Sequence, residues 1–139
     1  MPRVCKILLV EDYDEVREML SEALDLEGFQ FTAVASAREM HEALDREDYD
    51  IAVIDISLPG GEDGFTLAEA AHDLGCGVIL ITGDHSHKER LEQSGHHHLL
   101  KPFGVRDFLA LVSRVLAEIA SRCVRRKRRN GEFFPLRAG

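Results

Sequence analysis

The chain has 139 residues, which is enough for one domain with a buried core and too few for two domains that each have one. Its composition, 45% hydrophobic and 30% charged, is that of a globular protein, and no apolar run approaches the length of a membrane span. The net charge of −8 is unevenly divided. After Ala120 there are seven Lys or Arg and one acid, a balance of +6, so residues 1–120 carry −14. This acidity argues against nucleic acid as a partner of the body, while the basic tail suits polyanions.

Short apolar runs alternate with helical repeats along the whole chain. The runs predict five strands, at residues 6–10, 29–34, 51–55, 78–81 and 96–100. The repeats predict helices over residues 12–28, 36–46, 64–74, 86–94 and 105–129. Three of the helix starts have an Asp or Ser followed three residues later by Glu, the spacing of a capping box: Asp12–Glu15, Ser36–Glu39 and Ser86–Glu89.

Five alternations of strand and helix predict an α/β fold with a doubly wound, five-stranded parallel sheet covered by helices on both faces. The expected strand order is 2-1-3-4-5, the flavodoxin-like order, with the second strand at an edge. We expect one domain over residues 1–120 and a basic helical extension and tail over residues 121–139.

The cysteines and the N-terminus carry information about compartment. The three cysteines are odd in number, far apart and without a CxxC pair, which argues against a disulfide framework and a zinc site: Cys5, Cys76 and Cys123. The N-terminus lacks the apolar core of a signal peptide. We therefore expect a cytoplasmic protein that does not associate with membranes.

Polar residues gather where the predicted strands end. Glu11 and Asp12 follow the first strand, Asp55 ends the third, Thr82 ends the fourth and Lys101 follows the fifth. In a parallel sheet these ends lie at one rim, where ligands bind. Three carboxylates in one place repel one another, and a divalent cation with the lysine ammonium balances their charge. A few carboxylates with room for water and phosphate suit Mg²⁺, so the set predicts a phosphoryl-handling site.

These motifs resemble the receiver domain of two-component response regulators, in particular the single-domain chemotaxis regulator. The resemblance covers about residues 4–120 and rests on Glu11-Asp12, the run Asp-Ile-Ser-Leu-Pro-Gly from Asp55, Thr82-Gly83, and Lys101-Pro102-Phe103. It implies that Asp55 accepts a phosphoryl group from a phosphohistidine. It further implies that Asp12, Asp55 and the Ser57 backbone carbonyl ligate Mg²⁺, and that Glu11 acts mainly through water.

The resemblance also assigns the response to phosphorylation. It implies that Lys101 pairs with a phosphoryl oxygen and that Thr82 turns in to the phosphate, which shifts a surface made of the fourth helix, fifth strand and fifth helix. The expected protein is a phosphoacceptor that assists its own phosphorylation and dephosphorylation, rather than an enzyme. Its expected partners are a sensor histidine kinase or a histidine phosphotransfer protein, and a downstream protein target. Dimerisation through the same surface is left open.

Three positions depart from the family pattern. His98 replaces the aromatic switch residue that precedes the lysine by three positions, so protonation enters the expected switch. The loop 59–64 has one residue more than is common. Ser57 and Asp84 occupy the two positions that tend to set phosphoryl lifetime, and an acid at Asp84 can either orient or repel water.

Two other functions remain as alternatives. The histidines near residues 85–98 suggest a zinc or nickel site, but three consecutive histidines on a strand point to alternate faces, so at most two can share an ion. The basic tail suggests a module that binds nucleic acid or an acidic partner, although cations at a helix end also suit its dipole.

Only about 19 residues follow the last core helix, so we expect a stand-alone receiver without an output domain.

Overall fold

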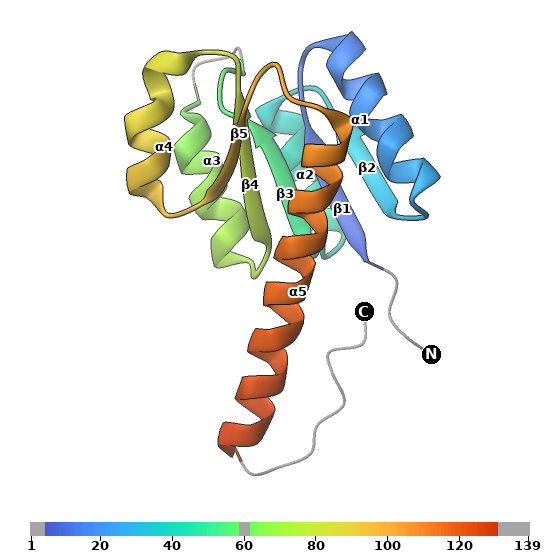
Figure 1. The fold of residues 1–139 in the computed structure, drawn as a ribbon, viewed down its shortest axis with the longest axis vertical. Coiled ribbons are helices and arrows are strands. Elements are labelled where there is room, and N and C mark those ends of the chain that lie inside the picture. The colour runs from blue at the N-terminus through green and yellow to red at the C-terminus, as the bar shows by residue number, and fades with distance from the viewer. Residues whose placement is uncertain (1–4, 59–61, 131–139) are drawn as a thin grey trace.

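The computed structural model describes residues 5–58 and 62–130, with side chains described as far as Ser121. Strands and helices alternate along the chain (Figure 1). The strands are β1 (Lys6–Val10), β2 (Gln30–Val34), β3 (Ile51–Asp55), β4 (Gly77–Thr82) and β5 (His97–Leu100). The helices are α1 (Asp14–Leu26), α2 (Ala37–Arg46), α3 (Gly64–Asp73), α4 (Lys88–Ser94) and α5 (Val105–Asn130), with a 3-10 turn η1 (His85–His87) before α4.

All five strands form one parallel sheet in the order β2-β1-β3-β4-β5, which confirms the predicted fold class and strand order. β3 lies at the centre and is buried along its whole length, as its apolar run predicts. Val10 pairs with Ile54, and Asp55 pairs with Ile81. The carboxyl ends of β1, β3 and β4 therefore lie at one rim of the sheet.

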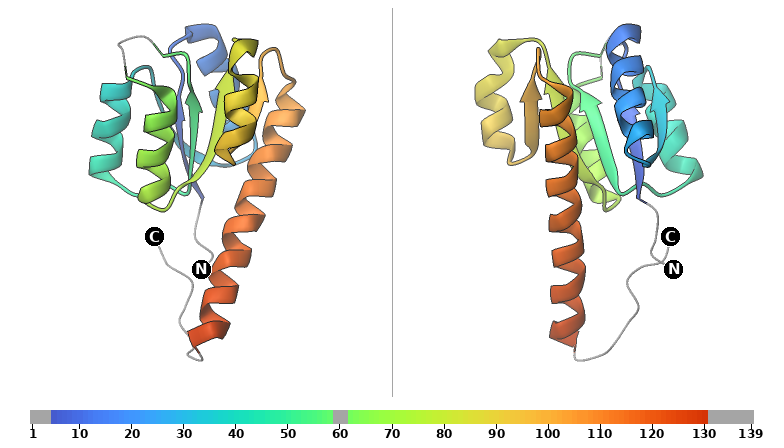
Figure 2. Two further views of the ribbon diagram at one scale, coloured as in Figure 1. Left: turned by 90° about the vertical axis from the view of Figure 1, so that its left-hand side faces the viewer. Right: turned by 45° about the vertical axis from the view of Figure 1, so that its right-hand side comes forward.

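Helices cover both faces of the sheet (Figure 2). On one face, Leu20 and Leu24 of α1 pack with Phe108, Val112 and Val115 of α5 against alternate residues of the strands. On the other face, α2, α3 and α4 supply the apolar cover: Met40, Ala43, Leu67, Ala68, Ala71 and Leu91. Among the described residues, 16 buried side chains cluster on one face and 11 on the other, and their burial is the main stabilising term for this fold.

The helix starts agree with the predicted caps in one case out of three. The Ser36 hydroxyl accepts a hydrogen bond from the Glu39 amide. The Glu39 carboxylate in turn accepts from the Ser36 hydroxyl and the Ala35 amide, which confirms the capping box of α2.

The other two cap predictions are wrong. Tyr13, not Asp12, is the N-cap of α1, and no side chain caps that helix, because the carboxylate of the preceding residue lies in the rim cluster. At η1 the capping side chain is Asp84, which accepts from the Ser86 amide at 2.9 Å. Ser86 is therefore the residue that is capped.

Two features set the shape around the site. Gly64 starts α3 in close contact with the end of β3, since a Cβ there would lie 2.4 Å from Ile56 Cα. α5 is a single helix of 26 residues that continues well past the end of the sheet (Figures 1 and 2). Among the described residues, no helix combines the length and apolarity needed to cross a membrane.

Candidate functional site

Asp55 is held at the carboxyl end of the central strand and is only 3% exposed. Its two carboxylate oxygens have different partners. The Ser57 amide donates to Oδ1 at 2.8 Å, and the Lys101 ammonium donates to Oδ2 at 3.0 Å. Donors fixed on both oxygens give the carboxylate one orientation.

Glu11 is the most deeply buried acid of the site, with no exposed surface. The Tyr13 amide donates to Oε2 at 3.1 Å, and Lys101 Nζ lies 2.7 Å from Oε1. The second contact is an ion pair, and Oε1 makes no hydrogen bond among the described residues. Burial raises the pKa of the Glu11 carboxyl to about 7, against the opposing effect of Lys101.

Asp12 completes a group of three carboxylates. One oxygen each from Glu11, Asp12 and Asp55 lies within 4.8 Å of the others, and Asp12 is exposed while the other two are buried. A buried oxygen without a hydrogen bond beside two more carboxylates is a favourable place for a hard cation. The donor set therefore fits Mg²⁺, with one side of the group open to water.

Lys101 connects this group to the neighbouring strand. Burial alone lowers the pKa of the Lys101 ammonium, but its contacts with Glu11 and Asp55 raise that pKa above its ordinary value overall. The Lys101 amide also donates to the Thr82 carbonyl at 2.8 Å. The Lys101 ammonium therefore places a positive charge beside two carboxylates, and the Lys101 amide links the ends of β4 and β5.

Thr82 is fully buried at the end of β4. Its hydroxyl lies 3.0 Å from the Ser57 hydroxyl and accepts from the Asp84 amide at 3.0 Å. Since the Ser57 amide binds Asp55, Ser57 bridges the phosphoacceptor candidate and Thr82. The structure thus brings together Glu11, Asp12, Asp55, Ser57, Thr82 and Lys101, the six residues predicted for the chemistry.

His98 lies apart from this group, in the middle of the edge strand β5. It is half-buried, pairs in register with Leu80, and its Nδ1 lies 3.4 Å from the His96 carbonyl. Its neighbours point to opposite faces, as strand geometry requires: His96 contacts Glu69 at 3.0 Å and His97 contacts Glu118 at 2.9 Å. The three histidines are not among the metal-binding groups found in the described residues.

A charged contact between α3 and α4 was not predicted from the sequence. Arg90 of α4 contacts the Asp63 carboxylate at 2.7 Å and lies 4.2 Å from the centroid of the Phe65 ring. The contact with Arg90 lowers the pKa of Asp63 although burial acts to raise it. His87 lies edge-on to the same ring and 3.6 Å from Asp84. These side chains join the loop after β4 to the start of α3, and their separation in sequence left no local signal.

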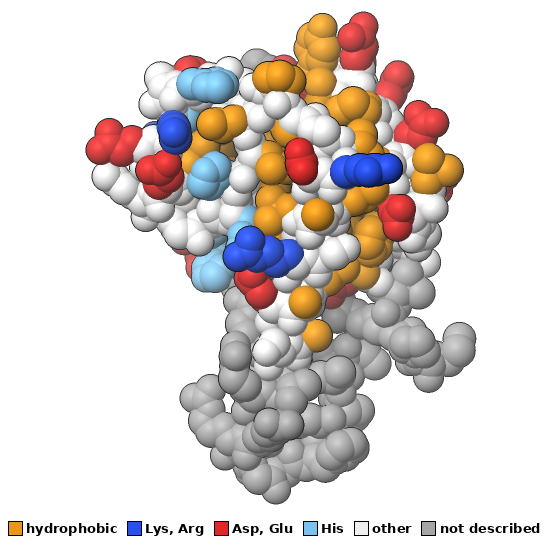
Figure 3. Space-filling model, in the orientation of Figure 1, with side chains coloured by type: hydrophobic (Ala, Val, Ile, Leu, Met, Phe, Trp, Pro, Cys, Tyr) orange, Lys and Arg blue, Asp and Glu red, His pale blue; other side chains and the backbone are white. Residues whose placement is uncertain are grey.

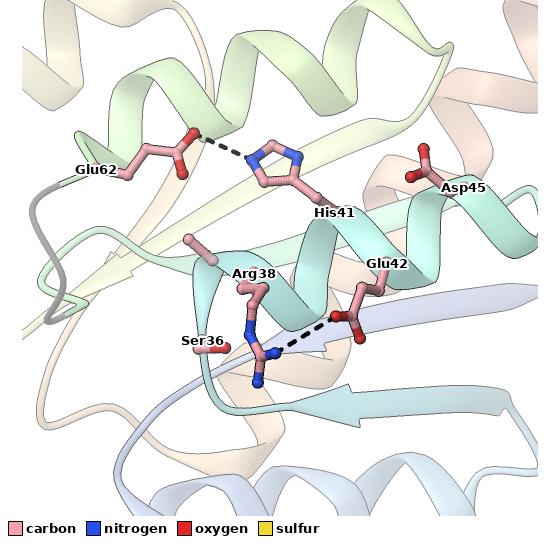
Figure 4. Close-up of a pocket in the computed structure, with 7 residues that line it drawn as sticks. Ser36, Arg38, His41, Glu42, Asp45 and Glu62 are labelled. Atoms are coloured by element: carbon pink, nitrogen blue, oxygen red, sulfur yellow. Dashed lines mark hydrogen bonds and ion pairs between the residues drawn. The ribbon is translucent and has the colours of Figure 1, made fainter.

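A shallow depression of about 630 Å³ lies elsewhere, over the outer side of α2. In Figure 4, Glu62 reaches from the loop before α3 towards His41 of α2, and their side chains are 3.0 Å apart. The lining is polar or charged except for one alanine: Ser36, Ala37, Arg38, His41, Glu42, Asp45 and Glu62. None of the predicted site residues lines this depression, so the rim carboxylates remain the better candidate. The extra residue predicted for the preceding loop lies in residues 59–61, outside the described residues.

Comparison with known proteins agrees with this geometry. The sequence pattern of the response regulator receiver domain matches residues 7–113. The chain is 36% identical over 117 residues to the transcriptional regulatory protein GltR of Pseudomonas aeruginosa, covering 79% of this chain and 48% of that protein. It is 32% identical over 133 residues to the regulatory protein VirG of Rhizobium rhizogenes, covering 92% and 54%. The chain thus spans about half the length of these curated relatives.

Solved structures show the same fold. A CheY-like receiver domain protein from Methanospirillum hungatei superposes with a TM-score of 0.78 at 28% identity, covering 86% of this chain and 98% of that one. The response regulator TrrA of Thermotoga maritima, solved with Mg²⁺ and beryllium fluoride, has a TM-score of 0.72 at 23% identity, covering 81% and 99%. Family pattern, relatives and rim geometry agree, and the chain belongs to the response regulator receiver domain family of two-component signalling.

Proposed function

We propose that this chain accepts a phosphoryl group on Asp55 from a phosphohistidine and signals by the resulting change of its surface. The observation that carries the proposal is the pairing of a buried, oriented carboxylate with Lys101 at 3.0 Å inside a group of three carboxylates. A carboxylate oxygen of Asp55 attacks phosphorus, an acyl phosphate bond forms, and the phosphorus–nitrogen bond breaks. The electron pair leaves with the imidazole, which takes up a proton.

Each residue of the rim has a task in this step. The Ser57 amide holds Oδ1 and so orients the attacking carboxylate, while Lys101 neutralises charge that develops on a transferred oxygen. Asp12, Asp55 and the Ser57 carbonyl are the proposed ligands of Mg²⁺, with Glu11 acting mainly through water. When bound, Mg²⁺ would offset part of the negative charge of the three carboxylates, so that a negatively charged phosphoryl group could approach them. The same residues would position water for the slow hydrolysis of the acyl phosphate.

The proposed response begins at Thr82. Its hydroxyl would exchange the bond with Ser57 for one with the phosphoryl group, and the loop that carries Asp84 would follow. His98 lies on β5, the strand next to β4, and takes the place of the family's aromatic switch residue. We propose that the α4–β5–α5 surface then binds a downstream protein or a second copy.

The proposed donors are a sensor histidine kinase or a histidine phosphotransfer protein, in the cytoplasm. The division into a receiver over residues 1–120 and a basic extension over 121–139 belongs to the same proposal. The relatives GltR and VirG are about twice as long as this chain, so the proposal concerns the receiver itself.

Incubation with acetyl phosphate and Mg²⁺ tests the proposal. The intact mass should rise by one phosphate, and chelation of Mg²⁺ should prevent the increase. Asp55→Asn keeps the shape of the side chain and should remain unmodified, whereas Asp73→Asn, on the exposed end of α3, should react as the native protein does. A normal yield from the Asp55→Asn protein would show that another residue accepts the phosphate.

Binding of an acidic partner by the basic segment is a second function that one observation favours. α5 continues ten residues past Ala120, and those residues include six Lys or Arg and no acid. If nucleic acid is that partner, affinity for a DNA duplex falls steeply with salt and disappears on truncation after Ala120. Affinity that survives the truncation contradicts this function.

A further inference from the structure

The part of α5 beyond Ala120 carries a dense positive charge. Its ten residues continue the helix that begins at Val105. Its six cations stand at positions that include spacings of three and four, where like charges destabilise a helix: Arg122, Arg125, Arg126, Lys127, Arg128 and Arg129. A partner that supplies negative charge would remove this penalty.

α1 has the opposite character. From Asp12 to Glu27 the sequence holds seven acids and one arginine, a net charge of −6. Within the described residues, ion pairs join only Asp14 of these acids to a cation, besides the Glu11 contact that precedes them. The last turn of α1 contains no basic residue, although Asp25 lies there beside the negative end of the helix dipole. In the part of the chain that the structure describes, most acids of α1 are thus unpaired where cations would be most favourable.

The same helix exposes apolar surface. Of the four large hydrophobic side chains that are exposed in the described residues, Met19 and Leu26 belong to α1 and Tyr13 precedes it. Leu26 is 79% exposed. Figure 3 shows acidic side chains with apolar ones between them along the edge that α1 forms. A complementary helix would carry cations around a small apolar centre, and the α5 extension has this sequence, with Cys123 and Val124 among its arginines.

The two surfaces cannot meet within one molecule. α1 and α5 lie side by side on one face of the sheet, and α5 is uninterrupted, so its last turns point away from the body (Figures 1 and 2). We therefore propose that the α5 extension of one copy docks on the C-terminal half of α1 of a second copy, around Met19, Glu22, Asp25 and Leu26. This contact differs from pairing through the α4–β5–α5 surface and leaves the rim carboxylates accessible. It does not depend on phosphorylation.

Sedimentation of the full chain tests this proposal at about 0.02 M and about 0.5 M salt, because exposed charges attract over much shorter distances at the higher concentration. The full chain should self-associate at low salt and dissociate at high salt. The chain truncated after Ser121 should be monomeric in both. A full chain that is monomeric in both conditions, or a truncated chain that still associates, would overturn the proposal.

Charge reversal identifies the surfaces. Glu22→Lys with Asp25→Lys should weaken self-association about tenfold or more, since each exposed charge pair contributes a factor of a few. The matched control, Asp73→Lys with Glu92→Lys, changes two exposed acids of α3 and α4 and should leave association unchanged. Asp55→Asn should also associate normally, which separates this test from that of phosphoryl transfer. Equal losses in the α1 variant and its control would contradict docking on α1.

A mixing experiment makes the test specific. A second variant, Arg125→Glu with Arg126→Glu and Arg129→Glu, should not self-associate. Mixed with the α1 variant, it should form complexes, because the basic extension of one protein meets the acidic α1 of the other and the reversed pair meets likewise. No complex in the mixture would refute complementary docking, and an extension that binds DNA but neither α1 surface would assign it to nucleic acid.

Discussion

The hydroxyl groups of Ser57 and Thr82 lie 3.0 Å apart and share a hydrogen bond that joins the loop after β3 to the end of β4. Thr82 also accepts from the Asp84 amide. For Thr82 to reach a phosphoryl group on Asp55, the bond to Ser57 has to break, whereas the bond to the loop can move with it. In the proposed mechanism the Ser57 hydroxyl therefore opposes the movement of Thr82, while the Ser57 amide orients the proposed phosphoacceptor.

Ser57→Ala should make the switch easier. The substitution keeps the amide bond to Asp55 and removes the hydroxyl that Thr82 has to leave, a difference of about 0.5–1.5 kcal/mol. Beryllium fluoride with Mg²⁺ should bind up to about tenfold more tightly, as followed by the amide resonances of Thr82 and Gly83. Ser57→Thr retains a hydroxyl and serves as the control. Equal or weaker binding by the alanine variant would count against this role.

Glu11 should make the metal-free protein less stable as pH rises. Its folded-state pKa of about 7 lies above the ordinary value of 4.5, so the folded chain holds a proton that the unfolded chain releases. This contribution is fully present below pH 4.5 and is lost as pH rises through about 7. The free energy of unfolding, relative to that of Glu11→Gln, should fall by about 2–3 kcal/mol over this interval.

Urea unfolding of both proteins in chelator, at several pH values, measures this difference. Mg²⁺ should reverse the trend above pH 7, because the cation takes the place of the proton. A difference between native and Glu11→Gln proteins that stays constant with pH would show that the Glu11 carboxyl titrates normally.

Gly64→Ala should damage both stability and phosphoryl uptake. A Cβ at this position would lie 2.4 Å from the backbone of Ile56, so α3 has to move away from the residue that follows Asp55. Crowding of this kind costs about 1–3 kcal/mol. Thermal unfolding and the acetyl phosphate assay measure the two effects. Gly83→Ala is the control, since its Cβ would meet Lys101 at an ordinary 3.7 Å; equal behaviour of the two variants would argue against the close contact.

Arg90→Gln should loosen α4 without unfolding the domain. The substitution removes the contacts with Asp63 and the Phe65 ring. The arginine side chain is 57% exposed, so the total loss should be at most about 1 kcal/mol. Hydrogen exchange should become faster in α4 and the loop before it, and Arg38→Gln on α2 should have no such effect. Unchanged exchange in α4 would show that the Arg90 contacts do not restrain it.

Much of the fold could be predicted because local patterns and sheet topology agree. The all-apolar run before Asp55 predicts a central strand, and the alternation of strands and helices predicts a parallel sheet, in which the strand without polar residues at its end lies at an edge. Once the order is known, Glu11, Asp12, Asp55, Thr82 and Lys101 necessarily meet at one rim. The Ser36 cap was predictable for a related reason, since all its partners lie within four residues.

The failures have a physical cause as well. Asp12 has the spacing of a cap but belongs to the carboxylate group, so a tertiary requirement displaces a local one. At η1, Asp84 lies two residues before Ser86 and accepts a hydrogen bond from the Ser86 amide, so the turn begins before the predicted cap. The contacts of Arg90 with Asp63 and Phe65 join residues more than twenty positions apart, a relationship that helical or strand periodicity does not encode.

Because α5 is long, a small tilt of the helix at the sheet moves its far end by a larger distance. Phe108, Val112 and Val115 fix the first half of the helix to the sheet, and the remaining turns continue past it (Figure 2). About 22 Å of helix separates Val115 from Asn130, so a tilt of about 5° at the sheet displaces the last turn by about 2 Å. A small rearrangement beside β5 would thus reach the far end of α5 enlarged, at a distance from the rim where it began.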